Sequence, residues 1–295
     1  MPQLLLLLLY LQCASASASA ETSDAHSAES LRARYAALTE QLQHNQFHQP
    51  LVLDSSESSG ALTGNIHARL AHPFAAVDAA LRDPTHWCDV LILNVNTKYC
   101  HVSTSDAGIV LTLNIGKKTP QPLEDTYRLD FTYRVAASAD DYFQVQLDAD
   151  KGPLSTRDYR ILMEAVALDD GETFLHLTYS YAYGFAGRLA MNTYLSTTGR
   201  GKVGFTIVGT QPDGQPEYIR RMRGLVERST MRYYLAIEAY LSAVDAPPAE
   251  QLEQRLQNWF SATELYPRQL HEVDRAAYLD MKRSEYLRQQ TMGMP

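Results

Sequence analysis

Two histidines and two cysteines lie close enough in the sequence to raise the question of a metal site. His86 and Cys88 are two residues apart, and Cys100 and His101 are adjacent. Adjacent residues on a strand point to opposite faces, so Cys100 and His101 could ligate one ion only across a bulge. The spacing also lacks the paired C-x-x-C or H-x-x-x-H ligands of common zinc sites. We therefore predict no metal site here.

Two motifs of common catalytic and phosphate-binding sites are missing from the sequence. The chain contains no G-x-S-x-G nucleophile elbow and no G-x-x-x-x-G-K-[ST] phosphate loop. The basic glycine run at residues 199–202 is interpreted as a loop before a strand rather than an anion site. An enzyme would need an acid and a base that converge in one cavity, and His176, Glu164 and Asp130 are the titratable residues on predicted strands. No cofactor is predicted.

Aromatic residues follow two predicted strands with a period of two. They are Tyr127, Phe131 and Tyr133 on one strand, and Tyr179, Tyr181 and Tyr183 on the other. A buried tyrosine offers an apolar body and a hydroxyl that needs a partner. Such a wall suits a large, mostly apolar ligand with one or two polar handles. Tyrosine is also common on the solvent side of a strand, so parity alone leaves the face of each strand open.

A long helix is predicted over residues 217–244, with Pro216 at its start and the next proline at Pro247. About 27 residues would extend about 40 Å. One stripe of this helix comprises Tyr218, Met222, Leu225, Val226, Ser229, Tyr233, Ala236, Ile237 and Tyr240. The arginines lie off this stripe, and we expect them on a solvated or salt-bridged face.

The remaining elements are predicted from their period. Helices are expected at 27–43, 73–81, 84–91 and 186–195, and strands at 51–53, 62–70, 95–103, 109–115, 127–135, 143–149, 159–168, 173–183 and 203–209. Turns rather than helices link most of these strands, so the sheet is antiparallel, and a sheet this long must curl. The predicted fold is α+β: a curved antiparallel sheet that grips the long helix, with space between them.

One short motif makes this prediction more specific. Residues 152–159 read GPLSTRDY, and Pro153, Ser155, Arg157 and Asp158 lead into a predicted strand. This run resembles the P-x-S-x-R-D-[YF] signature of START domains, the lipid-transfer branch of the START/Bet v 1-like (SRPBCC) superfamily, over about residues 27–244. Several members carry a cavity arginine six residues after the motif arginine, where this chain has Met163. The resemblance therefore implies a helix-grip fold with a more apolar pocket wall.

If the motif keeps its family orientation, Tyr159, Ile161 and Met163 point into the cavity. The predicted cavity wall comprises Trp87, Tyr127, Phe131, Tyr133, Tyr159, Ile161, Met163, Tyr179, Tyr181, Phe205, Met222, Val226, Ser229, Tyr233 and Ile237. His176, Glu164 and Asp130 have the opposite parity to the inward residues of their strands, which disfavours catalysis in the cavity. The predicted gate is the segment 186–195.

The net charge and the N-terminal residues indicate which partners and which cellular compartment to expect. The 295 residues carry a net charge of −8, which argues against nucleic acid as a partner. Residues 1–20 are predicted to be a signal peptide, with an apolar core at residues 4–11 and an A-x-A site before Glu21. We expect an exported, periplasmic protein; a lipoprotein anchored at Cys13 is the alternative. In an oxidising compartment, Cys88 and Cys100 are predicted to form a disulfide, with two buried thiols as the alternative.

The sequence divides into a START-like domain at 27–244 and a helical extension at 247–295, in which we expect helices at 250–260 and 267–289. The extension is predicted to cover the apolar back of the long helix.

The function predicted is binding, and shuttling, of a lipid or sterol-like ligand, with transient contact to a membrane surface or transporter. Two other classes are a cavity enzyme of the cyclase, aromatase or hydrolase type, and a partner-binding scaffold that uses the extension.

Overall fold

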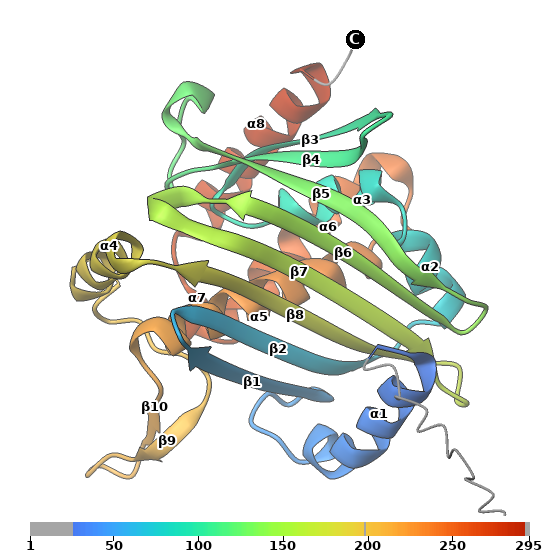
Figure 1. Cartoon of the computed structure of the whole chain (residues 1–295), viewed down its shortest axis with the longest axis horizontal. Coiled ribbons are helices and arrows are strands. Elements are labelled where there is room, and N and C mark those ends of the chain that lie inside the picture. The colour runs from blue at the N-terminus through green and yellow to red at the C-terminus, as the bar shows by residue number, and fades with distance from the viewer. Residues whose placement is uncertain (1–25, 198, 293–295) are drawn as a thin grey trace, which may run out of the picture.

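A computed structural model describes residues 26–197 and 199–292 (Figure 1). One antiparallel sheet of eight strands has the order β1-β2-β8-β7-β6-β5-β4-β3. The strands are β1 (Leu51–Ser58), β2 (Ala61–Leu70), β3 (Thr97–Ser105), β4 (Gly108–Ile115), β5 (Tyr127–Ser138), β6 (Tyr142–Lys151), β7 (Thr156–Ala167) and β8 (Thr173–Tyr183). The sheet curves in front of a long helix, α5 (Arg221–Leu241), which confirms the predicted helix-grip fold.

Alternation along the central strands directs one face of the sheet toward α5. Along β8, buried residues alternate with half-buried ones, as expected for a strand with one fully covered face. Ile161 and Met163 on β7 are fully buried on the side of α5, which is the inward parity predicted from the motif. The turn at residues 169–172 joins β7 to β8, with Gly171 at φ +82°.

Helix α5 touches the sheet most closely at β2. A Cβ added to Gly64 of β2 would lie 2.3 Å from the hydroxyl oxygen of Thr230 on α5. Glycine is therefore required there, because a side chain would push the helix away from the strand. At this place the two layers leave no room for a ligand, so the space between them opens elsewhere along the helix.

Two short helices pack on the sheet, α2 (Phe74–Leu81) near β7 and α3 (Pro84–Leu91) near the edge strand β3, to which the disulfide joins it. Helix α2 precedes α3, whose N-cap Asp83 accepts a hydrogen bond from the Thr85 amide. Cys88 of α3 forms the predicted disulfide with Cys100 of β3, with a Cα–Cα distance of 5.3 Å. These cysteines are therefore unavailable as metal ligands.

The N-terminal helix packs on the outer face of the sheet. Helix α1 (Ala28–Gln43) starts at a capping box made by Ser27 and Ser30. Its buried leucines, Leu31, Leu38 and Leu42, join a small core on β6, β7 and β8 that is separate from the main core under α5. The sheet is therefore covered on both faces near this corner.

The segment before the long helix differs from prediction. One strand is predicted at 203–209, but only its last residues are part of a strand, β9 (Ile207–Thr210). This strand pairs with β10 (Pro216–Tyr218) in a hairpin that is separate from the main sheet. The prediction that Pro216 starts the long helix is wrong, because the Asp213-Gly214 turn folds this proline back into β10. Helix α5 begins at Arg221. The first strand is also longer than predicted, since residues 54–58 continue it to the turn at Gly60.

The extension forms three helices. They are α6 (Pro248–Glu264), α7 (Pro267–Leu270) and α8 (Arg275–Met292), so the single helix expected at 267–289 is interrupted at residues 271–274. Helices α6 and α7 pack on the back of α5, while α8 packs on α6 and β3. Trp259 and Tyr278 stack at 5.0 Å, and Phe260 and Leu270 are buried in the main core. Among the described residues, no helix combines the length and the apolar character needed to span a bilayer. The predicted signal peptide and Cys13 lie outside the described residues.

Candidate functional site

A cavity of about 770 Å³ lies between the sheet and α5. Its walls come from the end of β4 and the loop after it, from β5, β7, β8 and α5, and from the segments before β3 and before α8. Helix α4 (Phe185–Ser196) adds Met191. The lining residues are Asn94, Asn96, Thr97, Ile115, Gly116, Lys117, Lys118, Thr119, Gln121, Asp125, Tyr127, Leu129, Pro153, Leu154, Thr156, Tyr159, Tyr179, Tyr181, Met191, Leu225, Arg228, Ser229, Arg232, Tyr233 and Glu272.

Four tyrosines form a continuous aromatic wall in this cavity. Tyr159 of β7 stacks on Tyr181 of β8 with ring centroids 5.1 Å apart, and Tyr179 lies 5.6 Å from Tyr181 and 5.0 Å from Tyr233 of α5. Burial raises the pKa of all four phenols above the usual value. They therefore stay neutral and can act as hydrogen-bonding handles beside an apolar surface. The hydroxyl of Tyr159 pairs with that of Thr156 at 2.7 Å.

Another part of the cavity is charged. The Glu272 carboxylate, 10% exposed, contacts Arg232 Nη2 and Lys118 Nζ at 2.5 Å each. Lys202 Nζ lies 3.8 Å from the same carboxylate. Burial favours the neutral acid, but Arg232, Lys118 and Lys202 hold the pKa of Glu272 below its usual value. Arg228 is 1% exposed and donates to the carbonyls of Val203 and Gly224.

The structure places the predicted wall residues in two groups. Those that line the cavity are Tyr127, Tyr159, Tyr179, Tyr181, Ser229 and Tyr233. Those that lie in the packed core are Trp87, Phe131, Tyr133, Ile161, Met163, Phe205, Met222, Val226 and Ile237. Within α5 the division follows the helix faces, because Val226 and Thr230 pack against Gly64 of β2 whereas Leu225, Ser229 and Tyr233 line the cavity.

Sequence reasoning missed the charged half of the cavity. Arg228 and Arg232 lie three residues after Leu225 and Ser229, so they share a helix face with them. Both arginines are buried, so this face is not solvated, and the salt-bridged alternative holds for Arg232, which pairs with Glu272. Their spacing on that face was the available signal. Glu272 had no such signal, because it reaches the cavity from the extension, 40 residues after Arg232.

The motif residues and the predicted gate lie side by side at one end of the cavity. Arg157 is exposed and ion-paired with Asp158, while Pro153 and Leu154 line the cavity. The backbone between them is unusual, since Leu154, Ser155 and Asp158 have φ of 57°, 61° and 53°. Helix α4 packs on this turn and buries Met191, yet Phe185 and Leu189 are 85% and 61% exposed.

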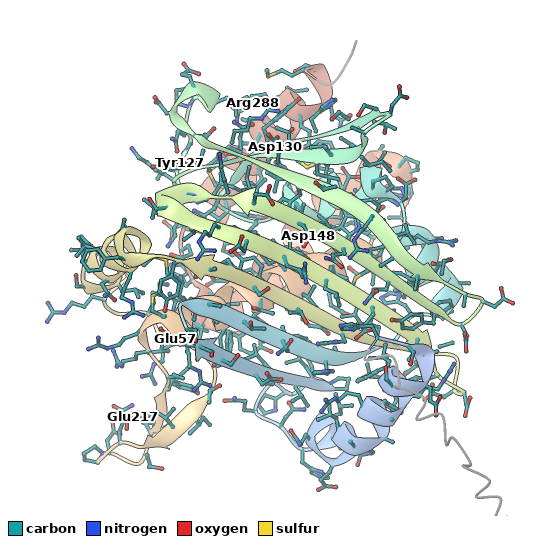
Figure 2. All side chains as sticks on the ribbon, viewed as in Figure 1. Glu57, Tyr127, Asp130, Asp148, Glu217 and Arg288 are labelled. Atoms are coloured by element: carbon teal, nitrogen blue, oxygen red, sulfur yellow. A yellow bond between two sulfur atoms is a disulfide. The ribbon has the colours of Figure 1, made fainter. Side chains whose placement is uncertain are left out.

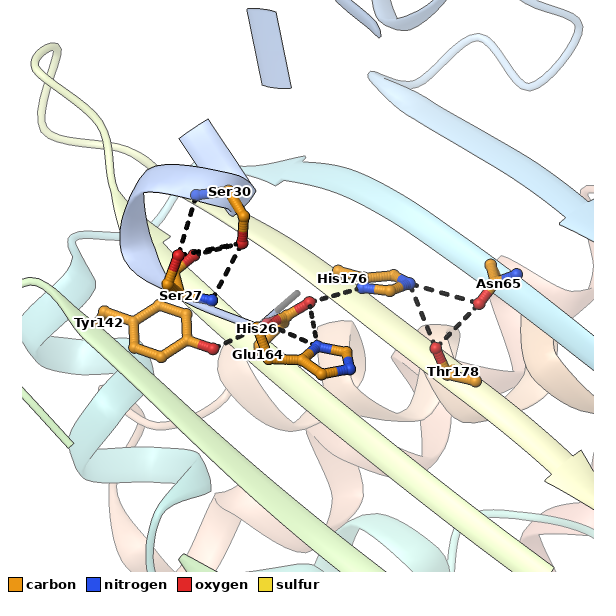
Figure 3. Close-up of polar contacts among 8 residues, drawn as sticks. All are labelled: His26, Ser27, Ser30, Asn65, Tyr142, Glu164, His176 and Thr178. Carbon is orange, nitrogen blue, oxygen red and sulfur yellow. Dashed lines mark hydrogen bonds and ion pairs between the residues drawn. The ribbon is translucent and has the colours of Figure 1, made fainter. Parts of the chain in front are cut away.

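The titratable strand residues lie on the outer face of the sheet, away from the cavity. Glu164 accepts hydrogen bonds from His176 Nδ1 at 2.8 Å and from the Tyr142 hydroxyl at 2.7 Å (Figure 3). Burial opposes ionisation of Glu164, but these two partners hold its pKa below the usual value. The start of α1 covers the pair through His26. Asp130 on β5 is labelled in Figure 2. Its carboxylate accepts a hydrogen bond from the Thr112 hydroxyl at 2.6 Å.

Comparison with known proteins finds similar folds. No family model and no curated protein sequence matches the chain. Similar solved structures include Ara h 8.0201 at 12% identity and a TM-score of 0.37, over 62% of this chain and 99% of that one. Human StAR-related lipid transfer protein 5 matches at 11% and 0.32, over 59% and 89%. Truncated norcoclaurine synthase from Thalictrum flavum matches at 16% and 0.32, over 49% and 90%. This likeness concerns the fold alone.

Proposed function

We propose that the chain binds a hydrophobic small molecule, such as a lipid or a sterol-like compound, in the cavity between the sheet and α5. The observation that carries the proposal is the cavity of about 770 Å³ with a wall of four tyrosines. Ligand pockets of small molecules have this size and this mixture of apolar lining with a few polar groups. The tyrosine wall offers flat apolar surface, and its neutral hydroxyls supply the handles.

The burial of an alkyl chain is sufficient to drive such binding. Each methylene transferred from water contributes about 0.8 kcal/mol, so about ten of them contribute about 8 kcal/mol. That is the scale of a micromolar dissociation constant, before the entropic cost of association is subtracted. A ligand of this kind needs no strong polar contact to be retained.

Exchange of the ligand requires an entrance, and we propose α4 for it. Helix α4 forms part of the wall through Met191, while it exposes Phe185 and Leu189 on either side of Arg188. Exposed apolar side chains beside a cation suit transient contact with a lipid surface. We further propose that the protein is exported and shuttles its ligand between membranes.

We favour binding over catalysis in this cavity. The carboxylates on its described wall are Asp125, which is exposed, and Glu272, whose pKa is held low by three cations. A general base works best with a pKa near the working pH. The histidine–glutamate pair of Figure 3 lies beyond the sheet, on the side of α1.

The proposal is tested first by what the protein carries. We expect the organic extract of protein purified from cells to contain a lipid or sterol-like compound by mass spectrometry. A panel of lipids and sterols should raise the melting temperature, because a ligand that binds the folded state stabilises it. An empty extract together with no shift by any member of the panel would contradict the proposal.

A cavity-filling variant gives a second test. Ser229→Trp places a bulky ring in the cavity, and we expect at least a tenfold loss of affinity for the best member of the panel. Ser103→Trp makes the same change on an exposed position of β3 and serves as the control. Equal binding by the two variants would place the ligand outside this cavity.

A further inference from the structure

Three cations converge around one carboxylate where the cavity meets the extension, and a fourth, Arg228, lines the same cavity. Arg232 and Lys118 contact Glu272 directly, and Lys202 lies 3.8 Å from it. Arg228 is on the same face of α5, one turn before Arg232. Lys118, Arg228, Arg232 and Glu272 all line the cavity. The cluster thus holds more positive than negative charge in a place that is largely removed from water.

This excess of positive charge is unfavourable in the absence of a further anion. Burial lowers the pKa of Lys202, Glu272 opposes this, and Lys118, Arg232 and Arg228 lower the pKa further. Like charges in a partly buried site repel strongly because the surrounding dielectric is low. In addition, Arg232 is 6% exposed and its Nε has no hydrogen-bond partner among the described residues. A buried donor without an acceptor costs free energy that a bound acceptor would recover.

The charged cluster is continuous with the aromatic wall. Arg232 and Tyr233 are neighbours on α5, as are Arg228 and Ser229, and all four line the cavity. A single molecule could therefore contact both the cations and the tyrosines. We propose that the cations bind the anionic group of an amphipathic ligand, a carboxylate or phosphate, while its apolar part lies along the tyrosine wall. This inference rests on the proposed function and specifies the class of ligand.

Glu272 has a defined part in this arrangement. Its carboxylate occupies the centre of the cation cluster and is supplied by the segment between α7 and α8. It therefore acts as an internal anion that a ligand's anionic group must share or displace. Neutralising it should strengthen binding of an anionic ligand, whereas a residue that served only to hold the fold would weaken binding when changed.

Calorimetric titration of the full chain with three matched probes tests the inference. The probes are decanoate, decyl phosphate and 1-decanol, which share one chain length and differ in the head group. We expect the two anions to bind at least tenfold more tightly than the alcohol, since hydrogen bonds to charged groups are the stronger class. Equal binding of all three would overturn the inference and leave the proposed function intact, whereas binding of none would contradict the proposed function itself.

Titration with inorganic phosphate and with acetate distinguishes an amphiphile from a free anion. We expect both to bind at least a hundredfold more weakly than the matched decyl compounds, because they gain nothing from the tyrosine wall. Phosphate that bound as tightly as decyl phosphate would overturn the assignment of an amphipathic ligand.

Variants in the cation cluster test the inference further, because they should change the affinity for an anion in opposite directions. Lys118→Gln, at a half-buried position, should reduce decanoate affinity by about tenfold and 1-decanol affinity by far less, because the alcohol carries no charge. Lys151→Gln, an exposed lysine at the end of β6, is the matched control and should change neither. Glu272→Gln should increase decanoate affinity by at least fivefold. If Lys118→Gln weakens both probes equally, or Glu272→Gln weakens decanoate in a folded protein, the inference is wrong.

Discussion

At the scale of single residues, His67 is held neutral by its surroundings on the outer face of the sheet. Its ring stacks on that of His176 at 4.2 Å with an interplanar angle of 4°. Burial, the neighbouring His176 and Arg34 lower the pKa of His67 from 6.5 to about 3. Its Nδ1 is buried without a hydrogen-bond partner among the described residues. The folded chain therefore resists protonation of this side chain.

We predict that His67 makes the fold sensitive to acid between pH 6.5 and pH 3. Above pH 6.5 the imidazole is neutral in the folded and unfolded chains. As the pH falls, the unfolded chain takes up the proton and the folded chain does so only near pH 3, so the free energy of unfolding decreases across this interval. We expect a full loss of about 5 kcal/mol, to be measured by urea denaturation at several pH values.

Replacing His67 by a residue with a ring that does not titrate separates the effect of His67 from general destabilisation by acid. His67→Phe keeps an aromatic ring beside Phe174 and should flatten the pH dependence in this interval. His44→Phe, at an exposed position of the C-cap of α1, should leave it unchanged. Identical slopes for wild type and His67→Phe would show that the proton is taken up elsewhere.

Residue parity predicted part of the cavity and could not predict the rest. Tyr159, Tyr179 and Tyr181 could be predicted as cavity residues, because strand alternation together with the START-like motif indicates the face on which they lie. The cations were not, since arginine on a helix is ordinarily solvated and only the curvature of the sheet decides which helix face is enclosed. Glu272 depends on a contact between distant segments, which period and spacing do not encode.

At the scale of elements, the disulfide fixes the helix that leads into the cavity wall. Cys88 lies in α3 and Cys100 in β3. The connection between these elements contains Asn94 and Asn96, and β3 starts at Thr97; all three residues line the cavity. Asn96 is held in turn by its side-chain bond to the Gly116 carbonyl at 2.9 Å. The bridge therefore closes a loop that includes part of the site.

We predict that removal of the disulfide costs about 3 kcal/mol in the free energy of unfolding, the chain-entropy value for a loop of about this size. The paired variant Cys88→Ala/Cys100→Ala should show this loss in urea denaturation, and wild-type protein should show it on addition of reductant. Reductant should leave the paired variant unaffected. A paired variant as stable as the oxidised protein would contradict the prediction.

Element boundaries were predicted well where the local signals agree and poorly where they compete. The helix α3 matches its prediction because an N-cap aspartate and a proline at its first position coincide. Before α5, the proline favoured a helix start while the Asp-Gly pair favoured a hairpin turn. The turn prevailed, because β9 and β10 supply the hydrogen-bonded partners that a turn needs.

At the scale of the whole molecule, the extension is tied into the sheet by a buried charged network. Glu285 of α8 contacts Lys98 of β3 at 2.9 Å and Lys282 at 2.7 Å. Lys282 also donates to the carbonyls of Asn94 and Thr97. Burial lowers the pKa of Lys282 to about 8, against the opposing effect of Glu285.

We therefore predict that the domain does not fold without its extension. Deletion of residues 247–295 would uncover Met231, Tyr234 and Leu235 on the back of α5, which are at most 2% exposed, and should give aggregated protein in size-exclusion chromatography. Glu285→Gln is the milder test and should cost about 3 kcal/mol, because two buried ammonium groups lose their carboxylate. A truncated chain that stays monomeric and binds ligand would instead identify the extension as a separate partner-binding module.

The strand order of the sheet has a consequence for the kinetics of folding. The hairpin of β1 and β2 is made early, yet its hydrogen-bonding partner is β8, and Ile66 pairs with Leu177 about 110 residues later. Contacts between segments so far apart in the sequence form slowly, because closing the long loop has a large entropic cost before the contact contributes any stabilisation. During synthesis the edge of β2 stays unpaired until β8 has been made, so it can pair with other chains in that time. The interval between the synthesis of β2 and of β8 is thus the time in which the nascent protein is most prone to aggregate.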